Sequence, residues 1–104
     1  AGWNLMVAWI SLLEVEVSLQ HGRVEPALET LHALKAIVDP RGHHFFMPEL
    51  LRLEGEAARL SGNHKAAAAH LAEAIKIARR QGARAVEARA ATDHARLSEA
   101  LPPS

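Results

Sequence analysis

Two stretches of the chain begin with glycine and repeat one pattern: residues 22–34 read GRVEPALETLHAL, and residues 62–74 read GNHKAAAAHLAEA. Apolar residues follow each glycine after five, nine and twelve positions, as Ala27, Leu31 and Leu34 and again as Ala67, Leu71 and Ala74. Steps of four and three residues mark one face of an α-helix. Because glycine commonly ends helices, each stretch marks the turn of a helical hairpin. The hairpin recurs after 40 residues, as Gly22 and Gly62 show.

Turn residues divide the whole chain into five expected helices, over about 4–20, 25–38, 48–60, 64–81 and 84–100. Pro26 and Pro48 fall in first turns, where the missing N–H costs nothing. No segment alternates with a period of two, so we expect no strand. The sequence therefore predicts an all-α fold with one domain over residues 1–100. Residues 101–104 form a tail, because Pro102 and Pro103 prevent the last helix from continuing.

The composition agrees with a small helical domain. Among 104 residues there are 21 alanines and 14 leucines, but only 12 valines, isoleucines and threonines together. Alanine and leucine favour helix over strand. The absence of cysteine excludes disulfides and thiolate chemistry. Twelve basic and twelve acidic residues give zero formal net charge, which disfavours a general nucleic-acid binder.

The longest apolar run, residues 5–13, is shorter than the about 20 residues that a membrane span needs. No basic segment precedes it, so we do not interpret it as a signal peptide. We therefore expect a cytoplasmic protein with no membrane contact. Because the chain starts with Ala1, we expect that it is processed or cut from a longer protein.

The glycine-centred pattern resembles the tetratricopeptide (TPR) repeat, a helical hairpin of about 34 residues. Gly55, Gly62, Ala67, Leu71 and Ala74 match its small and large positions in the second hairpin. A glycine inside a helix costs about 1 kcal/mol relative to alanine, and a close approach between Gly55 and Ala67 would explain it.

The first hairpin departs from the repeat, with Val15 and Leu34 where small residues are expected and an insertion of about six residues. The resemblance implies a short TPR-like α-solenoid, made of two hairpins and a capping fifth helix.

Residues 49–97 also resemble the C-terminal helical repeats of large bacterial regulators. Those regulators join an ATPase module to a nucleotide cyclase or to a LuxR-type DNA-binding domain. The resemblance rests on residues 49–56 (ELLRLEGE), 74–83 (AIKIARRQGA) and 87–97 (EARAATDHARL). It implies a regulatory module, while the catalytic and DNA-binding parts lie outside this sequence.

No catalytic motif is found: there is no phosphate-binding glycine loop, no nucleophile elbow and no H-E-x-x-H. We therefore expect neither enzyme activity nor a cofactor. Seven histidines include one adjacent pair, His43 and His44, which is a weak candidate for adventitious metal binding. A zinc site needs three or four converging ligands, so a metal-binding helical bundle stays an alternative.

Six basic residues lie between Lys76 and Arg96 with only two acidic residues among them. Such a stretch attracts acidic partners, but no aromatic side chains lie among them to stack on bases. We expect no nucleic-acid binding by this segment itself. A regulatory module of a DNA-binding transcription factor remains a second alternative.

In the TPR register, the first helix of each hairpin lines a concave groove that binds peptides. Candidate groove residues are Trp9, Leu12, Glu16, Glu49, Arg52, Glu56, Arg59 and Asp93. Four of these residues, Glu49, Arg52, Glu56 and Arg59, form one row on the third helix. The competing interpretation of this row is a solvated face with weak i, i+3 and i, i+4 ion pairs.

Apolar side chains cover most of the circumference of the first helix, although one stripe would suffice to pack on its hairpin partner. We therefore expect self-association, such as a homodimer, through this helix, or its docking on an upstream domain. Burial inside a compact five-helix bundle is the alternative. The candidate self-association residues are Trp3, Met6, Trp9, Ile10 and Leu13. The function predicted from the sequence is a non-catalytic module for protein or peptide binding, or for self-assembly, in a bacterial regulator.

Overall fold

The computed structural model describes residues 5–41 and 46–100, and five α-helices occupy almost all of this part. They are α1 (Leu5–Gln20), α2 (Val24–Arg41), α3 (Met47–Leu60), α4 (His64–Gln81) and α5 (Arg84–Ala100). The all-α prediction is confirmed for the described residues. One boundary differs: α2 continues to Arg41 instead of ending at residue 38. Pro40 falls in the last turn, where a proline removes a single backbone hydrogen bond.

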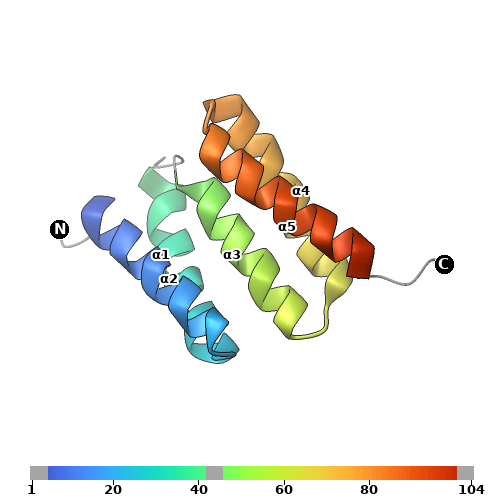
Figure 1. Cartoon of the computed structure of the whole chain (residues 1–104). Coiled ribbons are helices and arrows are strands. Elements are labelled where there is room, and N and C mark those ends of the chain that lie inside the picture. The colour runs from blue at the N-terminus through green and yellow to red at the C-terminus, as the bar shows by residue number, and fades with distance from the viewer. Residues whose placement is uncertain (1–4, 42–45, 101–104) are drawn as a thin grey trace.

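α3 is the central element of the molecule. It packs against α1 and α2 on one side and against α4 and α5 on the other (Figure 1). α1 packs only against α2 and α3 within the described chain, and α5 packs only against α3 and α4. The molecule is elongated, with extents of 49 × 30 × 20 Å. α1 and α5 therefore each have a side that no described helix covers.

The turns predicted after the first, third and fourth helices are confirmed. Gly22, Gly62 and Gly82 have φ values of 74°, 83° and 70°, the left-handed conformation that favours glycine after a helix. Asn63 then caps α4, since its side-chain oxygen accepts a hydrogen bond of 3.1 Å from the backbone N–H of Ala66. These short turns make α1–α2, α3–α4 and α4–α5 antiparallel pairs.

Gly55 marks a close approach between α3 and α4. A Cβ atom at Gly55 would lie 2.9 Å from Cγ of Leu71 and 3.3 Å from the carbonyl oxygen of Ala67. The expected contact of Gly55 with Ala67 is therefore confirmed. It explains why this helix carries a glycine in its interior despite the cost in helix propensity.

The repeated apolar positions form the core. Ala27, Leu31 and Leu34 on α2 are buried, as are Ala67, Leu71 and Ala74 on α4. α1 contributes one inner stripe, made of Ala8, Leu12, Val15 and Leu19. α3 is buried along its first nine residues, including three that are charged. The central helix thus carries charged groups into the interior.

Candidate functional site

A buried ion network joins three helices around Arg52 of α3. Its guanidinium donates to both carboxylate oxygens of Glu49, at 2.9 and 2.8 Å, one turn earlier on the same helix. It also donates to Asp93 of α5 and to Glu16 of α1, each at 3.0 Å. Arg52 is 7% exposed and Glu49 5%. A single cation therefore connects the first, third and fifth helices.

The pKa of Arg52 is raised above its usual value, chiefly by the hydrogen bonds from its guanidinium to Glu49. Burial opposes this shift, while the negative charge of Glu49 and the bonds to Asp93 and Glu16 add to it. Arg89 of α5 extends the network, at 3.2 Å from Glu16 and 4.0 Å from Glu49. Burying a charge is unfavourable unless partners compensate it, and here three carboxylates and two arginines do so.

The candidate groove residues have different environments. Leu12 belongs to the core, and Glu49 and Arg52 are buried in the network. These three side chains are not available to a peptide in this arrangement. Trp9 is 37% exposed and makes an edge-to-face contact with Phe46, with ring centroids 6.2 Å apart. Glu56, Arg59 and Asp93 remain at the surface, so the predicted groove now rests mainly on them.

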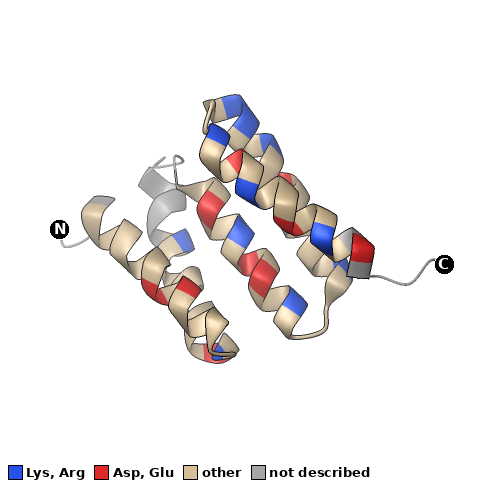
Figure 2. Cartoon of the chain, in the orientation of Figure 1, with Lys and Arg blue, Asp and Glu red and all other residues tan. Residues whose placement is uncertain are grey.

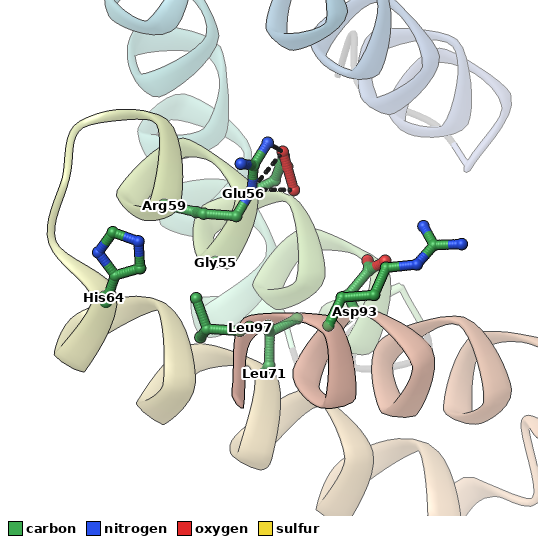
Figure 3. A pocket seen from close by; sticks show the side chains of 8 residues that line it. Gly55, Glu56, Arg59, His64, Leu71, Asp93 and Leu97 are labelled. Atoms are coloured by element: carbon green, nitrogen blue, oxygen red, sulfur yellow. Dashed lines mark hydrogen bonds and ion pairs between the residues drawn. The ribbon is translucent and has the colours of Figure 1, made fainter. Parts of the chain in front are cut away.

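A pocket of about 270 Å³ lies between α3, the start of α4 and α5 (Figure 3). Gly55, Leu71 and Leu97 form an apolar patch in it, with His64 to one side and Asp93 to the other. Arg59 and Glu56 form an ion pair at its edge. Hydrogen bonds to Glu56 raise the pKa of Arg59. The pocket combines an apolar floor with a charged rim.

The outer face of α1, here defined as Met6, Ile10, Leu13 and Val17, is the largest uncovered apolar feature among the described residues. These side chains are 71%, 49%, 61% and 52% exposed. They lie on the side of the helix opposite the inner stripe, because the two sets are offset by about half a turn. The alternative in which a compact bundle buries α1 on all sides is therefore not what the structure has. Trp3 lies outside the described residues.

Glu54 is a second buried charge on α3, facing α2. It is 7% exposed, and its Oε1 atom has no hydrogen-bond partner among the described residues. The ammonium of Lys35 on α2 lies 3.9 Å from that oxygen. Sequence reasoning did not single out this residue, which lies two positions before the half-buried Glu56 and therefore on a different face of the helix.

The histidine pair cannot be placed, since His43 and His44 lie outside the described residues. Within the described part, no group of three or more histidine, aspartate or glutamate side chains is arranged to hold a metal ion. No helix of the described chain is long and apolar enough to cross a membrane.

Comparison with known proteins gave no match to a family model, to a curated protein or to a solved structure. The functional argument therefore rests on the molecule itself. The TPR register placed Glu16, Glu49, Arg52 and Asp93 in one predicted groove. It missed that these side chains bind one another in a buried network, and that Arg89 extends it.

Proposed function

We propose that this chain is a non-catalytic protein-interaction module of TPR-like build that self-associates through the outer face of α1. The observation that carries the proposal is the exposure of Met6, Ile10, Leu13 and Val17 along one side of a helix. Its setting in a bacterial signalling or transcription regulator rests on the resemblance of residues 49–97.

An uncovered row of four large apolar side chains is unusual for a monomer. Contiguous apolar surface on a soluble protein commonly marks an interaction site. Burial of apolar area contributes about 25 cal/mol per Å², so covering this row stabilises an assembly. The row rises by steps of four, three and four residues, the spacing of a helix that packs along its length against another.

The interior gives the scaffold for such a surface. The inner stripe of α1 packs in the core, while Glu16 is held by Arg52 and Arg89. α1 is thereby anchored by apolar contacts and by the ion network, and its outer face is presented by a fixed helix. The succession of hairpins that pack through the central α3, with the close approach at Gly55, supports the TPR-like interpretation.

The double variant Ile10→Glu/Leu13→Glu tests the proposal. We expect it to reduce self-association measured by sedimentation velocity, because two carboxylates would be buried in the contact. The matched control is Ala69→Glu/Ala72→Glu, which adds the same charge at exposed positions of α4. Equal association of the two variants and the original chain would contradict the proposal. Circular dichroism should show the same helix content in all three.

A second candidate function is peptide binding in the pocket beside Gly55. Its apolar floor at Leu71 and Leu97, bordered by Arg59 and Asp93, favours an apolar side chain flanked by charged ones. Peptides selected on the intact chain from a displayed library would test this candidate. Their binding should fall with Arg59→Glu and persist with Lys65→Glu; an equal response of both variants would exclude the pocket.

A further inference from the structure

The charged residues are distributed unevenly between the two ends of the molecule. Residues 5–41, which form α1 and α2, contain five acidic and three basic residues. Residues 64–100, which form α4 and α5, contain four acidic and seven basic residues. Figure 2 shows Lys and Arg gathered on α4 and α5, whereas α1 carries only acidic charges. One end is therefore acidic and the other basic, although the net charge is zero.

α5 has an outer face of its own on the basic end. Ala90 and Leu97 are buried on its inner side, while Ala85, Ala88, Thr92 and Ala95 are exposed on the opposite side. This second set, the outer face of α5, rises by steps of three, four and three residues. It is a row of small side chains, so another helix can approach it closely.

Unpaired cations border this row. Arg84 and Arg96 flank it, and neither guanidinium has an ion-pair partner among the described residues. The exposed Glu99 continues the row beyond Ala95, so two cations and one carboxylate border this face. The outer face of α1 is the reverse in both respects. Its side chains are large, and its neighbouring charge is the exposed Glu14.

We propose that the outer face of α1 in one copy docks on the outer face of α5 in a second copy, so that the chains assemble head to tail. Large side chains on α1 fit against small ones on α5, and Glu14 comes near Arg84 or Arg96. The alternative pairing of two α1 helices brings two acidic ends together, which is unfavourable for like charges. This inference rests on the proposed function and names the surface that covers the outer face of α1.

A head-to-tail contact has a consequence for assembly size. The interface is heterologous, so every pair leaves one α1 face and one α5 face open, and assembly continues to a ring or a filament. A helix of 16 residues is about 24 Å long and about 10 Å across, so a single helix-on-helix contact is small beside the roughly 800 Å² that each partner of a standard complex buries. We therefore expect association that depends strongly on protein concentration, and that weakens in high salt because the end charges are screened.

Two blocked variants of the full chain test the proposal. The first is Ile10→Glu/Leu13→Glu, which blocks α1. The second is Ala88→Glu/Ala95→Glu, which blocks the outer face of α5 and leaves its buried side unchanged. Circular dichroism confirms folding, and sedimentation velocity gives the masses of each variant and of an equimolar mixture.

Head-to-tail docking predicts that each variant alone is monomeric and that the mixture forms a heterodimer, because each partner keeps one open face. The heterodimer should stop at two chains, while the original chain grows further.

Other outcomes overturn the proposal in distinguishable ways. If the α5 variant by itself dimerises to the same extent as the original chain, then α1 pairs with α1. The proposed function then stands without the head-to-tail contact. If the α1 variant associates normally, or if the original chain stays monomeric, both proposals fail. If both variants are monomeric and their mixture forms no heterodimer, head-to-tail docking is excluded.

Discussion

α3 and α1 contrast in what they bury. α3 carries Glu49, Arg52 and Glu54 into the interior, whereas α1 leaves Met6 and Leu13 mostly exposed. The place of each helix in the stack explains why α3 buries charged side chains and α1 exposes apolar ones. α3 packs against all four other helices, so even its charged positions are covered, while α1 packs against two.

The contrast teaches that burial in a stack of helices depends on place as well as on polarity. Charged side chains in the centre are tolerated when partners surround them, as the carboxylates surround Arg52. Apolar side chains at an end remain exposed until another surface covers them. We therefore assign the buried charges to the fold and propose the exposed apolar row as an interaction surface. Four comparisons, beginning with the largest expected effect, test this division.

Replacing the central cation should have the largest effect. Arg52→Ala leaves Glu49 buried without its main partner, and loss of one member of a buried ion pair costs about 3–5 kcal/mol. Urea unfolding monitored by circular dichroism gives the change in free energy. The double variant Arg52→Leu/Glu49→Leu should recover part of the loss, because it removes both buried charges together. A loss no greater than that of the exposed-pair variant Arg59→Ala would contradict the structural role of the network.

Filling the close approach at Gly55 should also destabilise the fold, by less than the loss of the central cation does. Gly55→Ala gains about 1 kcal/mol of helix propensity, but its Cβ would lie 2.9 Å from Cγ of the buried Leu71. Overpacking commonly costs about 1–3 kcal/mol, so we expect a net destabilisation of about 1 kcal/mol. The same urea measurement on Leu71→Ala and on the double variant Gly55→Ala/Leu71→Ala completes a double-mutant cycle. The cost of Gly55→Ala should shrink when Leu71 is already shortened, and a cost that stays the same would exclude the steric explanation.

The two buried carboxylates of α3 should differ. Glu49→Gln weakens two charge-assisted hydrogen bonds with Arg52, and such bonds contribute about 1.5–3 kcal/mol each. Within the described chain, Glu54 has a single recorded ion pair, with Lys35 at 3.9 Å. Removing its charge also relieves the cost of burying it, so Glu54→Gln should destabilise the fold less than Glu49→Gln. Thermal and urea unfolding of the two variants compare them directly. Equal losses would show that Glu54 also has a strong partner.

Adjacent leucines of α1 should give the clearest contrast, because replacing the exposed one should have the smallest effect of all. Leu13 is 61% exposed, so Leu13→Ser should change the unfolding free energy of the dilute chain by less than about 0.5 kcal/mol. Its neighbour Leu12 is 2% exposed, and Leu12→Ala should cost about 2–5 kcal/mol. Urea unfolding should be measured at a low micromolar protein concentration, so that self-association does not add to the free energy of unfolding. A large loss for Leu13→Ser would show that the outer face is covered within the monomer.

Sequence alone predicted much of this fold because its signals are local. Gly22, Gly62 and Gly82 mark turns by their conformational freedom, and the repeated steps of four and three mark the buried faces of α2 and α4. Gly55 indicated a close contact because its cost needs a reason. Each of these signals lies within one hairpin.

The site was less predictable because it depends on distant residues. Glu16 and Arg52 are 36 positions apart, and Arg52 and Asp93 are 41 apart. The TPR register predicted that the three residues line one face, but it did not show that their side chains pair with one another and are buried. For the same reason, the excess of apolar residues on α1 was visible in the sequence, while the covered and uncovered stripes became distinct only in three dimensions.

The most direct test of the central claim is the solution mass of the original chain by light scattering over a wide range of protein concentration, with and without a chelator. Self-association through α1 predicts a mass that rises with concentration above the 11.3 kDa of one chain and does not change with chelator. A mass that rises only without chelator would instead assign the contact to histidine-bound metal. A mass of 11.3 kDa at every concentration would contradict the account.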